Sequence, residues 1–149
     1  MWDSEPLNEC AYGFDRSGLD SSDHKELVTM TFSAVFAIVV GIGMIVQWAV
    51  SYAAKQIPEL LTEPIRIRFH IAGEILTALA LIGGGTGLLA GWPWAPTLFF
   101  VSMGMLFYTA IVSPGFFAQR DERIWVLLFG VLILIGLLAV FSVHAVVAA

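Results

Sequence analysis

Four long apolar stretches dominate this sequence and restrict the folds that it can adopt. They cover residues 28–54, 69–91, 96–118 and 124–149, and each reaches the roughly 20 residues that a helix needs to cross a bilayer. Mean hydropathy is +0.86 and only 13% of the residues are charged, which excludes an ordinary soluble domain. The sequence therefore predicts an all-α fold, an integral membrane four-helix bundle over residues 28–149 in the cell membrane.

Residues 1–27 differ sharply from the rest. They hold seven acids and two bases, which accounts for the whole net charge of −5. They contain few large apolar residues and no apolar core of a signal peptide, so we expect a flexible, acidic, extracytoplasmic tail. Its charge argues against binding to nucleic acid. Cys10 is the one cysteine of the chain, so no internal disulfide forms and we interpret it as a free thiol.

The bases between the spans predict the orientation. Lys55, Arg66 and Arg68 flank the first connection, and Arg120 and Arg123 lie in the third, whereas the second connection and the C-terminus carry none. Short loops rich in lysine and arginine face the cytoplasm. We therefore expect the first and third connections inside the cell and both termini outside.

Small residues predict where helices pack. The second span carries such residues at spacings of four, three, four and three, and the first span carries them at intervals of four. They are Gly73, Thr77, Ala80, Gly84 and Gly87 in the second span, and Ser33, Ala37 and Gly41 in the first. Because small residues let helix backbones approach closely in lipid, we expect a neighbouring helix against each row.

Glu74 is an ionisable carboxyl within the second span, and such groups are expensive in a membrane. Pro64 fits the first turn of this helix, where its missing N–H group costs no hydrogen bond. Arg66, His70 and Glu74 then recur every four residues on one face, which Thr77 continues. We therefore expect Glu74 to face protein and not lipid.

Polar residues at a matching depth on other spans are the candidate partners of Glu74. The first span offers Gln47 and Ser51, and the third offers Tyr108, Thr109 and Ser113. Together with Arg66, Arg68, His70 and Thr77 they form either a polar pocket open to the cytoplasm or a hydrogen-bonded knot that fixes helix register. The sequence leaves both interpretations open.

No cofactor or metal site is predicted. His70 and His144 lie about 30 Å apart in depth, too far to ligate one haem together. A haem held by His144 with Met103 or Met105 is an alternative, as is a quinone. A metal at His70 and Glu74 would need ligands that the sequence does not offer.

Residues 68–78 (RFHIAGEILTA), followed by residues 81–89 (LIGGGTGLL), resemble the second helix of DoxX-like membrane proteins. They are also similar to small prokaryotic four-span proteins of unknown function. The resemblance implies a membrane-embedded accessory subunit, in some relatives associated with quinone-linked oxidation. It transfers no catalytic residue, and the long acidic tail departs from that pattern.

Three functions follow from these features. The first is a structural or accessory subunit in the lipid bilayer, which pairs with a copy of itself or with a partner membrane subunit. The second is a small proton- or cation-coupled transporter or channel that uses Glu74. The third is an enzyme such as a four-span glutathione-type transferase, for which Arg66, Arg68 and Glu74 are the only support.

Overall fold

The computed structural model describes residues 16–55, 57, 62–119 and 123–148. The helices in this part of the chain are α1 (Arg16–Ala53), α3 (Pro64–Leu89), α4 (Ala95–Gln119) and α5 (Arg123–Val147), and no strand occurs there. All four are long and apolar enough to cross a membrane. The prediction of an all-α, four-helix membrane bundle is confirmed, and the chain is a multi-pass membrane protein.

Backbone chemistry explains why the spans are helical. Inside a bilayer no water is present to pair with N–H and C=O groups, so each span must satisfy them internally. Helices α3, α4 and α5 have 26, 25 and 25 residues, about 38 Å each, enough for a ~30 Å hydrocarbon layer. Pro64 stands in the first turn of α3, as predicted.

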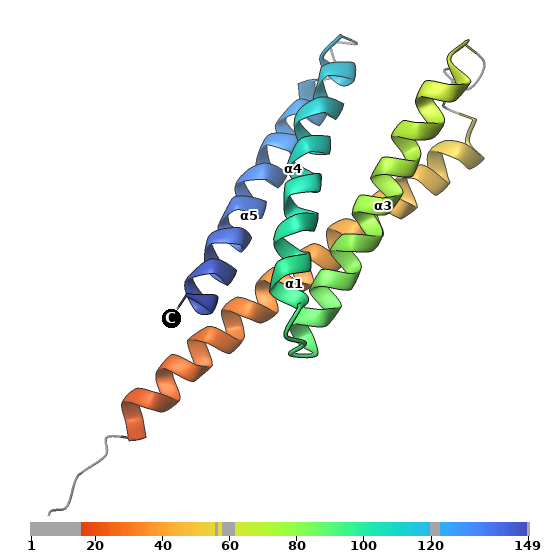
Figure 1. Ribbon diagram of the computed structural model, residues 1–149. Helices are drawn as coiled ribbons and strands as arrows, with labels where there is room; N and C mark the ends of the chain where they lie inside the picture. Colours follow the sequence, from red (N-terminus) through yellow and green to blue (C-terminus); the bar gives the residue numbers. More distant parts are fainter. Residues whose placement is uncertain (1–15, 56, 58–61, 120–122, 149) are drawn as a thin grey trace, which may run out of the picture.

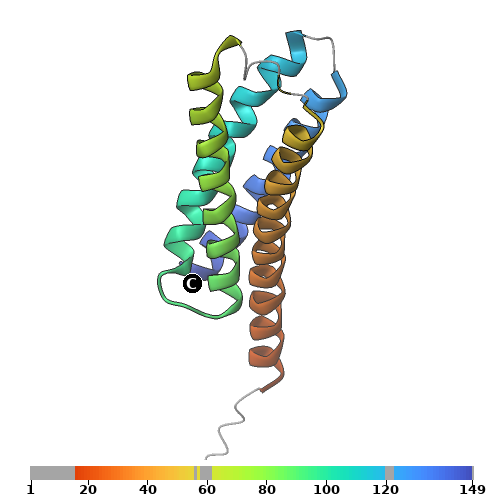
Figure 2. The same ribbon diagram turned by 90° about the vertical axis from the view of Figure 1, so that its right-hand side faces the viewer.

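Helix α1 is longer than the others and begins earlier than expected. It has 38 residues, about 57 Å, and its N-terminal end projects beyond the rest of the bundle (Figures 1 and 2). Residues 16–27, which we expected to belong to the flexible tail, are therefore helical. A helix pairs its own backbone groups, so it can continue past an apolar span into water. The remainder of the predicted tail, residues 1–15 with Cys10, lies outside the described residues.

The helices form a closed ring in which each packs mainly on two others. Helix α1 packs on α3 and α5, and α4 packs on α3 and α5 from the opposite side. The chain runs up and down, so the ends of α1 and α4 and the starts of α3 and α5 lie at one end of the bundle (Figure 1). Lys55, Arg66, Arg68 and Arg123 belong to that end, while the connection between α3 and α4 lies at the other.

A tight turn joins α3 to α4. Gly91 adopts a positive φ of 67°, and its N–H donates to the carbonyl of Leu88. The N–H of Trp92 donates to the carbonyl of Gly87. These two bonds satisfy the last carbonyls of α3 in the pattern of a Schellman motif, which favours glycine at the left-handed position. The turn holds α3 and α4 antiparallel and adjacent.

The predicted row of small residues on α3 packs against α4 at Gly84 and Gly87. A Cβ added to Gly84 would come within 3.0 Å of the Phe99 backbone on α4, and one added to Gly87 within 2.8 Å of the Ala95 side chain. Of the other predicted members, Thr77 is buried, Ala80 is half-buried and Gly73 is exposed. Gly85, which lies outside the predicted row, faces α1.

The predicted row on α1 also divides. Gly41 and Ala37 meet α3, since a Cβ on Gly41 would lie 2.7 Å from the carbonyl oxygen of Ala78, and one on Gly85 would lie 3.3 Å from the Cβ of Ala37. Ser33 is fully buried, and its hydroxyl donates to the carbonyl of Ala139 on α5 at 3.3 Å. A spacing of four therefore marked buried residues, but these three do not share one partner helix.

These approaches lead to a prediction for Gly85. A methyl group there would lie 2.6 Å from the carbonyl oxygen of Ala34, so α1 and α3 must separate. We expect Gly85→Ala to lower the free energy of unfolding by about 1–3 kcal/mol, the usual effect of overpacking. The measurement is unfolding by sodium dodecyl sulfate in mixed micelles.

Gly43→Ala is the matched control. Gly43 is exposed on α1, and no described atom lies within 4 Å of a Cβ added there. Because alanine also has the higher helix propensity, this variant should be neutral or stabilised by up to about 1 kcal/mol. Equal destabilisation of the two variants would show that the α1–α3 contact does not require a glycine at position 85.

Candidate functional site

Glu74 is the one buried ionisable side chain among the residues whose burial the structure describes. It lies on α3 ten residues beyond Pro64, about 15 Å along the helix, and is 8% exposed. Because α3 ends at Leu89, Glu74 is closer to the end of the bundle that carries the bases than to the α3–α4 turn. Burial of a charge is costly unless hydrogen bonds and a counter-charge compensate it. The surroundings of this carboxyl therefore define the candidate site.

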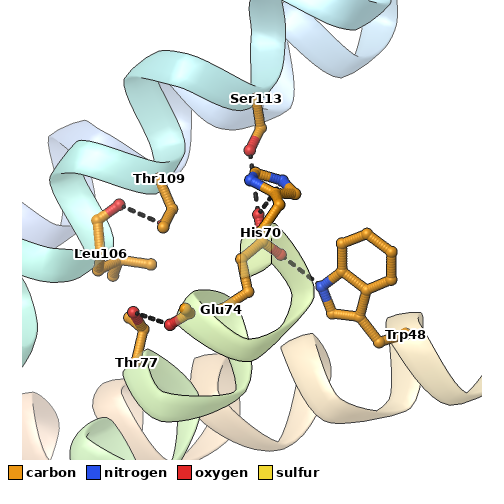
Figure 3. Close-up of polar contacts among 8 residues, drawn as sticks. Trp48, His70, Glu74, Thr77, Leu106, Thr109 and Ser113 are labelled. Carbon is orange, nitrogen blue, oxygen red and sulfur yellow. Dashed lines mark hydrogen bonds and ion pairs between the residues drawn. The ribbon is translucent and has the colours of Figure 1, made fainter. Parts of the chain in front are cut away.

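Three side chains from three helices reach the carboxyl. The indole Nε1 of Trp48 on α1 donates to Oε2 at 2.5 Å, and the hydroxyl of Ser113 on α4 donates to Oε1 at 3.2 Å. Nε2 of His70, one turn earlier on α3, lies 3.2 Å from the same Oε1 and forms an ion pair when its ring is protonated. Figure 3 shows Trp48 on one side of Glu74, with Ser113 and His70 at the other oxygen. The carboxyl thus joins α1, α3 and α4.

The register of α1 on α3 explains why Trp48 arrives here. The two helices are antiparallel, and the close approaches pair Ala34 with Gly85 and Gly41 with Ala78. The second pair lies seven residues later on α1 and seven residues earlier on α3. Another seven residues bring Trp48 to the level of residue 71, between His70 and Glu74. The Trp48 ring also meets the His70 ring edge-on, with centroids 6.0 Å apart.

Two threonines that we predicted for the site lie beside it and bond to their own backbone. Thr77 Oγ1 donates to the carbonyl of Gly73 at 2.8 Å, and Thr109 Oγ1 donates to the carbonyl of Leu106 at 2.9 Å. Both line a groove between α3 and α4. They contribute polar oxygens near Glu74 without contacting its carboxyl.

The other predicted members lie away from Glu74. The Arg66 guanidinium pairs with the exposed Glu63 at 2.7 Å, and Arg68 borders a separate hollow beside Tyr52. Gln47 is exposed and Ser51 half-buried on α1, and the structure shows neither bonded to Glu74. Tyr108 is exposed on α4, where it borders the groove.

Depth alone could not identify Trp48 as a ligand of the carboxyl. It selected the correct level of α1 but gave no side of the helix. A usable signal was present, because Gly41 and Trp48 are seven residues apart and share one face of α1 with Ala34. Extension of the packing face by one heptad predicts an indole donor at this level.

The α3/α4 groove opens sideways from Glu74. Its volume is about 730 Å³, and it is bordered by Phe69, His70, Gly73, Glu74 and Thr77 of α3 and by Val101, Gly104, Met105, Tyr108, Thr109 and Val112 of α4. Most of the surface that it exposes belongs to apolar atoms. It is a lateral recess in the membrane-facing surface, with its few polar atoms at one level.

The interior between Glu74 and the α3–α4 turn is closed. Leu81, Phe99, Met103, Leu106 and Val143 are buried and pack together there. Buried Ser33 and Ser102 direct their hydroxyls to backbone carbonyls. The described residues therefore offer no polar route from Glu74 through the bundle to that end. They also contain no group of three or more His, Cys, Asp or Glu side chains that could hold a metal ion.

The Trp48 bond gives a prediction for stability. Trp48→Phe keeps an aromatic ring but removes the donor to Oε2, so a buried acceptor loses its partner. We expect the free energy of unfolding to fall by about 1–3 kcal/mol in detergent melting.

Trp94→Phe, at the exposed α3–α4 turn, is the control. It should change stability by less than about 0.5 kcal/mol, as is usual for surface substitutions. Similar losses in the two variants would mean that the indole–carboxyl bond adds nothing to folding.

Comparisons with known proteins identify the family but no activity. No curated protein and no solved structure matches the chain. Residues 28–148 match a family described as a domain of unknown function, DUF8058. The match covers all four apolar spans together with Glu74 and its three partners. The chain therefore belongs to the DUF8058 family.

Proposed function

We propose that this protein is a structural or accessory subunit of a membrane complex. The observation that carries the proposal is the occupation of both oxygens of Glu74 by donors from neighbouring helices. A carboxyl bonded in this way fixes the relative positions of α1, α3 and α4. The closed interior beyond it supports a role in assembly over a role in conduction.

The outer faces supply surfaces on which a partner can pack. Helix α5 is the least buried of the four, and its exposed positions carry large apolar side chains. Gly43 on α1 has no described atom within 4 Å of a Cβ added to it. Exposed glycines in spans favour close helix contacts, so a second copy or another membrane subunit fits here.

A small proton- or cation-coupled transporter is the second candidate. His70 favours it, because its side chain is 40% exposed while it contacts the nearly buried Glu74. Both side chains of this pair border the groove. A transporter also needs access from the opposite end of the bundle, and the described interior offers none.

The enzyme interpretation depends on Arg66, Arg68 and Glu74 lying together. Arg66, Arg68 and Glu74 do not gather in one site, so we do not propose a transferase. The resemblance stays a prediction, as does the quinone or haem associated with it. The family match carries no information on either.

Two measurements on one preparation separate a subunit from a transporter. We expect the tagged chain, purified in mild detergent from its native membrane, to carry a stoichiometric partner or to form a defined homo-oligomer. Proteoliposomes with a pH dye inside should show no more proton flux with the wild type than with Glu74→Gln. If the wild type purifies without a partner and shows a proton flux that Glu74→Gln lacks, the protein is a transporter and not a subunit.

Glu74→Gln suits this test because glutamine can keep the network. Its carbonyl oxygen can accept from Trp48, which only donates, while its amide can donate to the Ser113 oxygen. We therefore expect an unfolding midpoint close to that of the wild type. Glu74→Leu leaves the half-buried Trp48 and Ser113 donors unpaired and should destabilise the chain by about 1–3 kcal/mol.

We also propose that the protein lies in the cell membrane with both termini outside. The bases at one end of the bundle support this, because they cluster at the ends of spans that short connections join. Cys10 should then react with a membrane-impermeant maleimide in intact cells. Labelling only after lysis would show that the orientation is the opposite one. A cysteine introduced at Ala54 is the matched control for the cytoplasmic side.

A further inference from the structure

The α3/α4 groove is wide because two of its bordering residues lack side chains. No described atom lies within 4 Å of a Cβ added to Gly73 or to Gly104, although these residues stand on facing helices. The neighbouring Phe69 and Val101 are 77% and 55% exposed, so the rims of the groove face the lipid. A slender molecule in the membrane can therefore enter it sideways.

The polar atoms inside the groove accept hydrogen bonds. The hydroxyls of Thr77 and Thr109 each donate to a carbonyl of their own helix. Each can therefore only accept a hydrogen bond from a ligand. Figure 3 places both threonines on the same side of Glu74, one on each helix. The carboxyl adds further acceptor capacity and, when ionised, a negative charge.

Other groups near the groove do not cancel this character. Arg66 is paired with Glu63, and Arg68 borders the separate hollow beside Tyr52. His70 directs Nε2 to Glu74, and the exposed Tyr108 stands at the rim with a hydroxyl that can accept as well as donate. A ligand of this recess must therefore bring donors, and a positive charge complements the carboxyl.

We propose that the α3/α4 groove binds an amphipathic primary amine, with its ammonium group at the level of Glu74. An ammonium carries three donors and no acceptor, which matches the oxygens of Thr77, Thr109 and Glu74. Its apolar chain lies along Phe69, Val101 and Val112 in place of lipid. An anionic amphiphile should bind less well because its charge repels the carboxylate. An alcohol should also bind less well because it offers a single donor and no positive charge.

The test compares three amphiphiles that share one alkyl chain. Decylammonium, decanol and decyl sulfate are titrated into the full chain in a maltoside detergent, and the heat of binding is measured by calorimetry. We expect saturable binding of decylammonium at one per chain, above the partition into empty micelles. Equal binding of decanol would overturn the charge requirement, and stronger binding of decyl sulfate would overturn the proposal as a whole.

Three variants locate the binding. Glu74→Gln should weaken decylammonium by roughly tenfold or more, because a charge-assisted bond is lost. Gly104→Leu fills the groove and should abolish saturable binding. Gly130→Leu on α5 is the matched control, since no described atom lies within 4 Å of a Cβ at either glycine. Unfolding midpoints of the three variants are measured in parallel.

The pair of leucine variants decides the outcome even if the glutamine variant is unstable. Wild-type affinity in Gly104→Leu, or an equal loss in Gly130→Leu, would place the amine outside the groove. Amine binding and partner assembly depend on different surfaces. If the chain binds decylammonium but purifies without a partner, the proposed amine site stands and the proposed accessory-subunit function fails.

Discussion

The close contact between α1 and α3 is the constraint on which the rest of the structure depends. In lipid, helices gain little by hiding apolar surface, so their association relies on contact between atoms at short range. Gly41 and Gly85 permit that contact, because a methyl group at either would collide with a carbonyl oxygen of the other helix. The same register then sets Trp48 beside Glu74. A packing requirement near the middle of the bundle thus determines the chemistry at one end.

The environment of Glu74 shows how a structural and a chemical role can share one residue. A carboxyl at the centre of a span costs about 2.5–3.5 kcal/mol on insertion scales, and hydrogen bonds from Trp48 and Ser113 offset that cost. Those bonds occupy one direction around each oxygen and leave capacity toward the groove. The side chain can therefore hold three helices together and still present negative charge to a ligand. A fixed carboxyl is also a better binding group than a mobile one, since little freedom is lost on binding.

The sequence was sufficient for the spans, because hydropathy and length follow directly from bilayer thickness. It also identified Glu74, His70 and Ser113, since depth along a span can be counted from flanking residues. It failed where the answer depended on which side of a helix faces a neighbour. Trp48 was missed for that reason, and Arg66 was included although it pairs with Glu63 outside the bundle. The start of α1 at Arg16 was missed because hydropathy marks the membrane and not the end of a helix.

The two ends of the bundle differ in a way that limits what this protein can do. From Glu74 toward the α3–α4 turn, Leu81, Phe99 and Met103 fill the interior, and Gly84 brings α3 against the backbone of α4. From Glu74 toward the basic end, the Ser113 hydroxyl of α4 donates to the Glu74 carboxyl of α3, and the groove opens beside this bond. The groove therefore exposes the carboxyl at the side of the bundle, while the described interior toward the α3–α4 turn is filled by side chains. Access from one side only is compatible with binding and with control of a partner. Transport would require the closed half to separate, against contacts that its glycines make especially short.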